Sequence, residues 1–334
     1  MADDTSLGSA EDRLIARYFK PLATHPAALG FNDDAAAIKP PPGCDLVLKT
    51  DGVIVGVHVF PDDPPAAIAQ KALRMNLSDL AAKGASPLGF LLSIALPKDM
   101  PESWVAQFAE GLSADAERFG CPLLGGDTDR TPGPIAVNIF AFGTVPHGRM
   151  VLRGGAKAGD RIVVTGSIGD AALGLALRRD PSLRARWRLD QQGHDHLAGR
   201  YLLPQPRNAI AEVLREHASG AMDISDGLAG DFAKLCRASG VAGEIEVARV
   251  PLSDGARSAV AAEPALIETV LTGGDDYEIL ATMPPVKVEP FRQAAAAVGV
   301  AVTEIGAIAA GEGACLLDQN GNALGFSRPS YSHF

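Results

Sequence analysis

The amino-acid sequence predicts a two-domain protein, with an α+β N-terminal domain followed by an α/β C-terminal domain. Its 334 residues exceed the roughly 250–300 residues at which a single hydrophobic core usually stops growing. Strand-like and helix-like segments occur in mixed order before Gly148, whereas strands directly precede helices after it. We therefore expect domains over residues 1–147 and 148–334.

The first half begins with apolar residues at helical spacing, which predict an amphipathic helix over residues 10–20. A proline run then separates this helix from an expected strand over 45–50. The elements that follow are a helix over 66–83, a strand over 89–96, a helix over 102–119 and a strand over 135–142. In the helix over 66–83, Asn76 and Asp79 share one face, which is either a narrow solvated stripe or part of a site.

The second half opens with a strand over 161–165 and a helix over 170–179. The glycine-containing turn between them, residues 166–170, either binds an anion at the helix N-terminus or is a plain connection. A polar segment over 180–204 has no assigned role. The remaining expected elements are a helix ending at Ser239, a strand over 243–250 and a strand over 277–283.

Composition is that of a globular protein, with 47% hydrophobic and 21% charged residues. The formal net charge is −10 and no basic run occurs, so nucleic acid is not an expected partner. The four cysteines form no C-x-x-C pair, which argues against a zinc ribbon or a disulfide framework. The N-terminus lacks a signal-peptide apolar region and no 18-residue apolar run follows it, so we expect a cytoplasmic protein with no membrane segment.

Acidic residues gather in six short clusters. A single Asp beside Gly is more often a turn former or a helix N-cap than a ligand. Six clusters together favour a magnesium–phosphate site, because Mg²⁺ binds carboxylates together with substrate phosphate oxygens. The P-loop, protein-kinase, α/β-hydrolase and zincin motifs are all absent from the sequence. The clusters are residues 32–34 (NDD), 50–52 (TDG), 76–79 (NLSD), 125–129 (GGDTD), 223–227 (DISDG) and 273–276 (GGDD).

This ordered set, with the segments between the clusters, resembles the thiamine-monophosphate kinases, a branch of the aminoimidazole-ribonucleotide-synthetase-like superfamily. The resemblance implies that fold, several Mg²⁺ ions, ATP as co-substrate, thiamine monophosphate as acceptor, and a homodimer. It also implies direct in-line transfer of the γ-phosphoryl group to give thiamine diphosphate. The motifs are residues 32–36 (NDDAA), 50–51 (TD), 56–58 (GVH), 71–73 (KAL), 76–82 (NLSDLAA), 125–128 (GGDT), 153–160 (RGGAKAGD), 223–228 (DISDGL) and 271–278 (LTGGDDYE).

The resemblance also implies a role for individual residues. The implied metal ligands are Asp33, Asp34, Thr50, Asp51, Asp79, Asp127, Asp223 and Asp226, of which Asp79, Asp127 and Asp226 are also implied to be catalytic. The implied nucleotide contacts are Gly126, Arg153 and Ser225, and the implied acceptor contacts are His58, Asp275 and Phe326. Without the resemblance, His58 reads as a surface or core-edge histidine and Arg153 as an ordinary loop arginine.

The sequence departs from the family pattern at three positions: Asn32 replaces a usual Gly, Lys49 a small hydroxyl residue, and Asp275 a usual Glu. Lys49 could replace part of one magnesium ion's charge. Superfamily rivals fit less well, because the chain ends without the terminal cysteine expected of a hydrogenase-maturation protein. It also has no cysteine before Cys44, whereas a selenophosphate synthetase is expected to carry a cysteine or selenocysteine in a glycine-rich N-terminal loop. The purine-pathway cyclo-ligase and a catalytically inactive nucleotide-binding protein remain alternatives.

Overall fold

The structure is a computed structural model that describes residues 9–326 and 330. The chain divides into two compact units. Unit 1 comprises Met1–Leu77 and Pro87–His147, and unit 2 comprises Ser78–Ser86 and Gly148–Phe334. Helix α2, Pro65–Ala82, begins in unit 1 and ends in unit 2.

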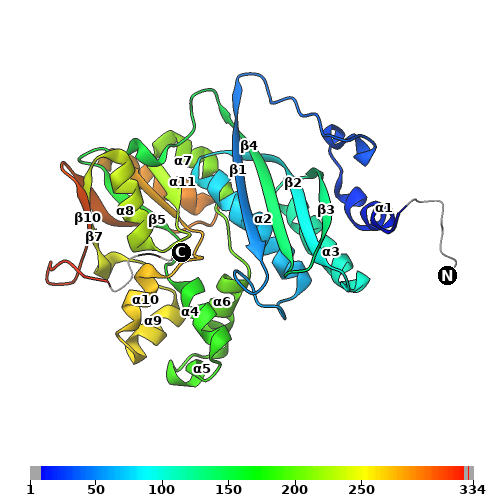
Figure 1. Cartoon of the computed structure of the whole chain (residues 1–334). Coiled ribbons are helices and arrows are strands. Elements are labelled where there is room, and N and C mark those ends of the chain that lie inside the picture. Colours follow the sequence, from blue (N-terminus) through cyan, green and yellow to red (C-terminus); the bar gives the residue numbers. More distant parts are fainter. Residues whose placement is uncertain (1–8, 327–329, 331–334) are drawn as a thin grey trace. The chain divides into compact units, whose positions relative to one another are not determined.

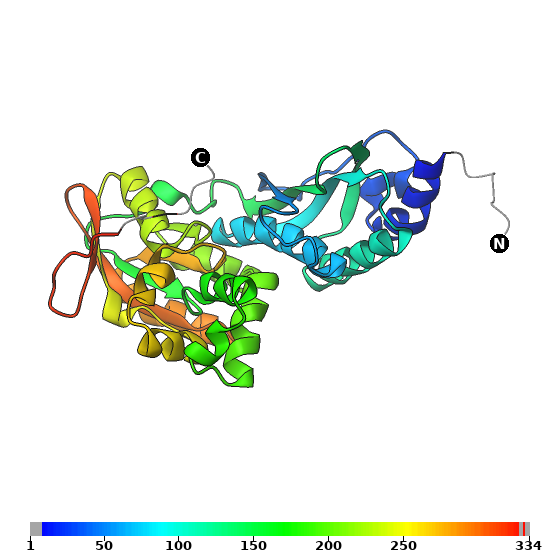
Figure 2. The same cartoon turned by 60° about the horizontal axis from the view of Figure 1, so that its bottom comes forward.

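Unit 1 is built on a four-stranded sheet in the order β1-β4-β2-β3. Strand β1 (Cys44–Ile54) is antiparallel to β4 (Ala136–Pro146), and β2 (Ser86–Pro97) is parallel to β3 (Leu123–Thr131). Helices α2 and α3 (Glu102–Arg118) cover one face of this sheet (Figures 1 and 2). The short helix α1, Ala10–Leu14, precedes the sheet in the chain and continues into a π-helical turn.

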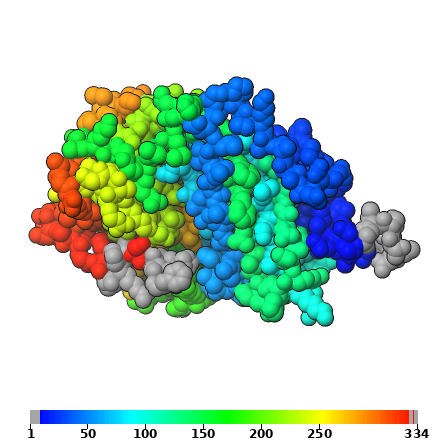
Figure 3. Space-filling view, turned by 45° about the horizontal axis from the view of Figure 1, so that its top comes forward, coloured from blue at the N-terminus to red at the C-terminus, as the bar shows by residue number. Residues whose placement is uncertain are grey.

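The two faces of this sheet differ in what covers them. Along β2, Phe90, Leu92 and Ile94 are buried, as alternation in a strand with one covered face requires. On the other face the side chains of Leu48 and Phe140 remain exposed. Residues of β1 (blue) and β4 (green) lie side by side on the surface in Figure 3. This face of the sheet therefore carries exposed apolar side chains.

Unit 2 contains a six-stranded sheet in the order β10-β7-β9-β5-β8-β6, in which β10 and β7 are parallel and the other recorded pairs antiparallel. Its strands are β5 (Arg161–Thr165), β6 (Gly220–Asp223), β7 (Ala242–Glu246), β8 (Ile279–Met283), β9 (Val302–Ala309) and β10 (Gly313–Leu317). Its helices are α4 (Asp170–Arg179), α5 (Leu183–Arg186), α6 (Gln191–Leu202), α7 (Ala211–His217), α8 (Leu228–Ser239), α9 (Asp254–Ala262), α10 (Leu266–Thr272) and α11 (Pro285–Ala297).

Both faces of the unit 2 sheet are buried. Alternate residues of β5 enter different core clusters, with Ile162 and Val164 in one and Val163 in the other. The first cluster includes Phe232 of α8, and the second includes Phe291 of α11. The sheet is thus covered on both sides, as in α/β architectures, but most of its strand pairs are antiparallel.

Most expected elements are found within a few residues of their predicted bounds, and the helix 66–83 is α2. Strand β1 is longer than predicted, because it continues past Asp51, and β3, which includes the turn-like segment 125–129, was not predicted as a strand. Strands β6, β9 and β10 and helices α7, α9, α10 and α11 were not assigned from the sequence. Among the described residues, no helix has the length and apolar character needed to span a membrane.

Candidate functional site

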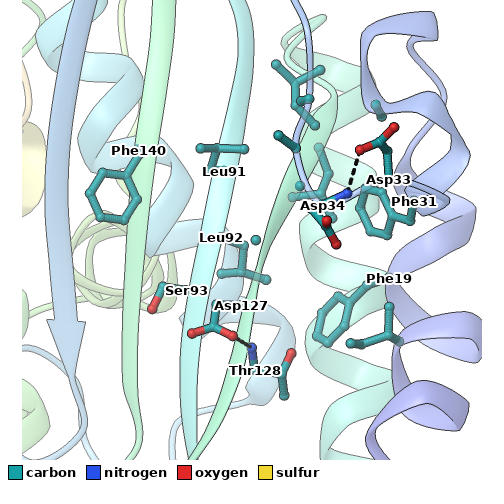
Figure 4. A pocket seen from close by; sticks show the side chains of 18 of the residues that line it. Phe19, Phe31, Asp33, Asp34, Leu91, Leu92, Ser93, Asp127, Thr128 and Phe140 are labelled. Carbon is teal, nitrogen blue, oxygen red and sulfur yellow. Dashed lines mark hydrogen bonds between the residues drawn. The ribbon is translucent and has the colours of Figure 1, made fainter.

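A cavity of about 580 Å³ in unit 1 collects three of the predicted metal ligands (Figure 4). Asp33 and Asp34 reach it from the segment before β1, and Asp127 reaches it from β3. The walls are otherwise mostly apolar, which is typical of ligand sites that use a few polar groups for orientation. The lining residues are Ile15, Phe19, Ala28, Phe31, Asp33, Asp34, Ala35, Ala36, Ile38, Leu91, Leu92, Ser93, Leu123, Leu124, Gly125, Gly126, Asp127, Thr128, Phe140 and Phe142.

Local backbone contacts orient these carboxylates. Asp33 Oδ1 accepts the N–H of Asp34 at 2.8 Å, and Asp127 Oδ1 accepts the N–H of Thr128 at 3.0 Å, as the dashed lines in Figure 4 show. Such bonds fix an Asp side chain against its own backbone. Gly126 is required by close strand contact, because a Cβ there would lie 1.9 Å from the carbonyl oxygen of Leu92.

Thr50 and Asp51 lie on β1, at the edge of the sheet opposite β3. Three strand spacings of about 4.8 Å separate these edges, so the structure does not bring Asp51 next to Asp127. Successive residues of a strand face opposite sides, and Thr50 pairs with Phe140, which lines the cavity. Asp51 therefore points to the sheet face that the helices cover.

Asp51 is held by neighbours on its own face. Its N–H donates to Asn76 Oδ1 of α2 at 2.8 Å, and its Oδ2 lies 3.1 Å from Lys49 Nζ. Lys49 thus supplies a positive charge beside Asp51. His58, in the turn after β1, accepts the N–H of Ile54 through Nδ1 at 3.0 Å. That bond leaves the proton of the neutral ring on Nε2.

Unit 2 gathers a second group of predicted residues around the end of β6. Asp223 is the last residue of β6, and its Oδ2 accepts the hydroxyl of Ser78 at 2.8 Å. The N–H groups of Ser225 and Asp226 both donate to Asp231 Oδ2, at 3.0 and 2.9 Å. A buried carboxylate in the first turn of α8 therefore fixes the loop that carries Ser225 and Asp226.

Lys234 joins this group from the next turn of α8. Its Nζ lies 2.5 Å from Asp226 Oδ2 and 2.8 Å from Asp231 Oδ1. Burial disfavours the charged amine, but the hydrogen bonds to Asp226 and Asp231 outweigh burial and raise the pKa of Lys234. Lys234 and Asp231 were not predicted from the sequence. Their i, i+3 spacing directly after the DISDG motif is the pattern that could have identified them.

Asp275 lies beside the same loop. Its N–H donates to the carbonyl of Ser225 at 2.9 Å, and its Oδ1 accepts the hydroxyl of Tyr277 at 3.2 Å. Both Asp275 and Tyr277 have positive φ, 70° and 51°, which side-chain-bearing residues rarely adopt outside functional sites. Phe326 is half-buried against the unit 2 core, and Arg153 is exposed in the 3₁₀ turn Arg153–Gly155.

Of the two alternatives for residues 166–170, the structure favours the plain strand–helix connection, because carboxylates of the protein occupy this helix start. Asp276 Oδ2 accepts the N–H of Gly169 at 2.8 Å. Asp170 is buried and accepts hydrogen bonds from Ser167 and Ser253, and it contacts His196 Nε2 at 2.8 Å. An incoming anion would meet two acidic side chains there.

The carboxylate oxygens of the site are ligands of the kind that Mg²⁺ prefers. Among residues 9–326 and 330, no group of three or more His, Cys, Asp or Glu side chains is close enough to hold a metal ion by itself. Mg²⁺ commonly binds through one or two carboxylates and completes its octahedron with water and substrate phosphate oxygens. The exposed carboxylates of Asp33, Asp34 and Asp127 on one cavity suit that mode of binding.

Comparisons with known proteins identify the family. The family models described as "AIR synthase related protein, N-terminal domain" and "AIR synthase related protein, C-terminal domain" match residues 32–145 and 157–317. The thiamine-monophosphate kinase of Caulobacter vibrioides is 41% identical over 303 residues, which are 90% of this chain and 84% of that relative. The chain belongs to the thiamine-monophosphate kinase family.

Solved structures of the family match over nearly the whole chain. The crystal structure of thiamine-monophosphate kinase from Stenotrophomonas maltophilia has a TM-score of 0.82 and 33% identity, covering 94% of this chain and 96% of that one. The structure of AaThiL complexed with AMPPCP and TMP has a TM-score of 0.76 and 30% identity, covering 100% and 99%. The resemblance and the two-domain fold class are thereby confirmed.

Proposed function

We propose that this chain transfers the γ-phosphoryl group of ATP directly to the phosphate of thiamine monophosphate, giving thiamine diphosphate and ADP. The observation that carries the proposal is the full-length likeness to AaThiL complexed with AMPPCP and TMP, together with 41% identity to a thiamine-monophosphate kinase. All the acidic clusters of the sequence lie in segments that these matches cover.

Mg²⁺ would be held by the carboxylates and would neutralise the charge that develops on the phosphate oxygens. The proposed metal ligands are Asp33, Asp34, Thr50, Asp51, Asp79, Asp127, Asp223 and Asp226, with Asp79, Asp127 and Asp226 acting at the reacting phosphates. Support comes from the shared cavity of Asp33, Asp34 and Asp127 in unit 1 and from the grouping of Asp223 and Asp226 in unit 2.

The other residues would position the two substrates. Gly126, Arg153 and Ser225 would contact the nucleotide, since an arginine and close backbone approach suit phosphate oxygens. His58 would donate from Nε2 to the acceptor phosphate, because its Nδ1 already accepts the N–H of Ile54. This donation does not require a protonated ring. Asp275, oriented by the Tyr277 hydroxyl, and Phe326 would contact the thiamine moiety.

We also propose a cytoplasmic homodimer. One face of the unit 1 sheet exposes apolar side chains of β1, with Leu46 at 40% and Leu48 at 66% exposure. Exposed apolar patches of this kind mark protein interfaces, and two-fold pairing is the commonest oligomer type. Light scattering after gel filtration tests the dimer, and a monomer at micromolar concentration would contradict it.

The function is tested by incubating the protein with ATP, Mg²⁺ and thiamine monophosphate, then separating thiamine phosphates by chromatography. We expect one thiamine diphosphate for each ADP formed. Selenide plus ATP and the purine-pathway formylglycinamidine substrate serve as acceptor controls for the superfamily alternatives. Tight Mg²⁺-dependent ATP binding without turnover of any acceptor would instead favour a catalytically inactive binding protein.

A further inference from the structure

Two polar side chains on one turn of α2, Asn76 and Ser78, are completely buried. The neighbouring residues Leu73, Leu77 and Leu80 are also fully buried, so Asn76 and Ser78 lie beside apolar side chains. A buried polar group lowers stability unless its hydrogen bonds are made. The partners of these two side chains therefore show what the polar groups do.

Ser78 contacts a proposed metal ligand within unit 2. Its hydroxyl donates to Asp223 Oδ2 at 2.8 Å, and Asp223 is itself only 5% exposed. Lys83, the residue after α2, donates from Nζ to the carbonyl of Ala221 at 2.7 Å, which ties β6 to the same helix end. The hydroxyl of Ser78 thus fixes the orientation of the Asp223 carboxylate.

Asn76 makes the corresponding contact within unit 1. Its Oδ1 accepts the N–H of Asp51 at 2.8 Å, and its Nδ2 donates to the carbonyl of Ala72 at 3.0 Å. The bond to Ala72 holds the amide in one orientation, so Oδ1 faces β1. The backbone of β1 is thereby fixed at Asp51, another proposed metal ligand.

We propose that Asn76 and Ser78 are positioning residues: Asn76 holds Asp51 within unit 1, and Ser78 holds Asp223 within unit 2, each in the orientation that binds a divalent cation; this rests on the proposed function. Groups that hydrogen-bond to metal ligands fix ligand orientation, and their loss typically lowers metal affinity by about 10- to 100-fold. Asn76 and Ser78 would then matter for metal binding although neither touches the metal or the substrate.

The test measures binding of Mn²⁺ by electron paramagnetic resonance in the presence of AMPPCP, with no turnover needed. Ser78→Ala should weaken the apparent Mn²⁺ affinity by about 10-fold. Ser258→Ala is the matched control, because Ser258 Oγ donates to the Trp187 carbonyl at 2.9 Å and touches no proposed ligand. Both variants should lose thermal stability, but Ser258→Ala should keep wild-type Mn²⁺ affinity. Asn76→Ala should weaken Mn²⁺ binding in the same way as Ser78→Ala.

Normal Mn²⁺ affinity in Ser78→Ala, together with a lowered melting temperature, would overturn the positioning role. Ser78→Cys, of similar volume but with a weak donor, replaces the alanine variant if that variant does not fold. Asp223→Asn separates the two proposals. If Asp223→Asn weakens Mn²⁺ binding and Ser78→Ala does not, only the positioning role fails. If Asp223→Asn binds Mn²⁺ normally, the assignment of Asp223 as a ligand fails as well. Wild-type Mn²⁺ binding without thiamine diphosphate formation would reject the proposed reaction alone.

Discussion

Replacing Asp276 by asparagine should stabilise the protein increasingly as pH rises. Asp276 is 1% exposed and its Oδ2 accepts the N–H of Gly169, while its Oδ1 has no hydrogen-bond partner among the described residues. Burial, with the neighbouring Asp170 and Glu278 carboxylates, raises the pKa of Asp276 well above the ordinary range. The native state therefore keeps Asp276 neutral at a pH where the unfolded chain, with a pKa near ~3.9, has ionised it.

The native state binds more protons at this position than the unfolded state, so the wild-type free energy of unfolding falls as pH rises above about 4. The slope is at most about 1.4 kcal/mol per pH unit, or up to about 2.7 kcal/mol between pH 5 and pH 7. The asparagine side chain of the Asp276→Asn variant cannot ionise, so the difference in the free energy of unfolding between variant and wild type should grow with pH, by at most that amount. For a unit of roughly 200 residues that upper limit corresponds to roughly 5–10 °C in melting temperature.

Urea unfolding at pH 5, 6 and 7 measures this difference. In a Trp104→Phe background, the fluorescence of Trp187, which is 1% exposed, reports unit 2 alone. Asp99→Asn, at an exposed position, is the control and should give a difference that does not change with pH. A difference for Asp276→Asn that stays constant across the three pH values would refute the reasoning, because it would show that Asp276 is ionised in the folded protein.

Three further substitutions, the last with a comparison substitution, test the site and the sheet. Asp79→Asn should lower turnover by roughly 10²-fold or more with an unchanged circular dichroism spectrum; near-normal activity would make Asp79 only part of a polar helix face. His58→Asn should raise the KM for thiamine monophosphate and barely change the KM for ATP; equal changes in both values would reject its contact with the acceptor. Gly126→Ala should lower the melting temperature strongly, because its Cβ would lie 1.9 Å from the Leu92 carbonyl oxygen. Gly199→Ala, in exposed helix with no atom within 4 Å, should instead stabilise by about 1 kcal/mol, and the reverse order would contradict the packing of β3 against β2.

The sequence was sufficient for elements whose ends are marked by proline or glycine. Helix α2 is an example, since Pro65 opens it and Gly84 follows its end. Strand β3 could not be predicted, because the GGDTD segment has the residues of a turn and strands are depleted in Gly and Asp. Its strand conformation depends on pairing with β2. At position 126 the two backbones approach so closely that only a residue without a Cβ, such as Gly126, fits. Tertiary contact therefore overrides local preference at this position.

The acidic residues of the site were identifiable from the sequence, but their arrangement was not. Thr50 and Asp51 are adjacent in the chain, yet the pleat of β1 turns them to opposite faces of the sheet. The contact of Ser78 with Asp223 joins residues 145 positions apart. No local pattern reports such a contact, so the groups that orient the carboxylates became visible only in the folded chain.

The central claim is direct transfer between two bound substrates, and the position of the transferred phosphorus tests it most directly. The protein would be incubated with ATP labelled with ³²P at the γ-position, Mg²⁺ and thiamine monophosphate, and quenched with acid at times shorter than one turnover. Apart from unreacted ATP, we predict label only in the terminal phosphate of thiamine diphosphate, with none bound to protein and none in inorganic phosphate. Label on the protein would contradict direct transfer, and label only in inorganic phosphate would contradict the kinase itself.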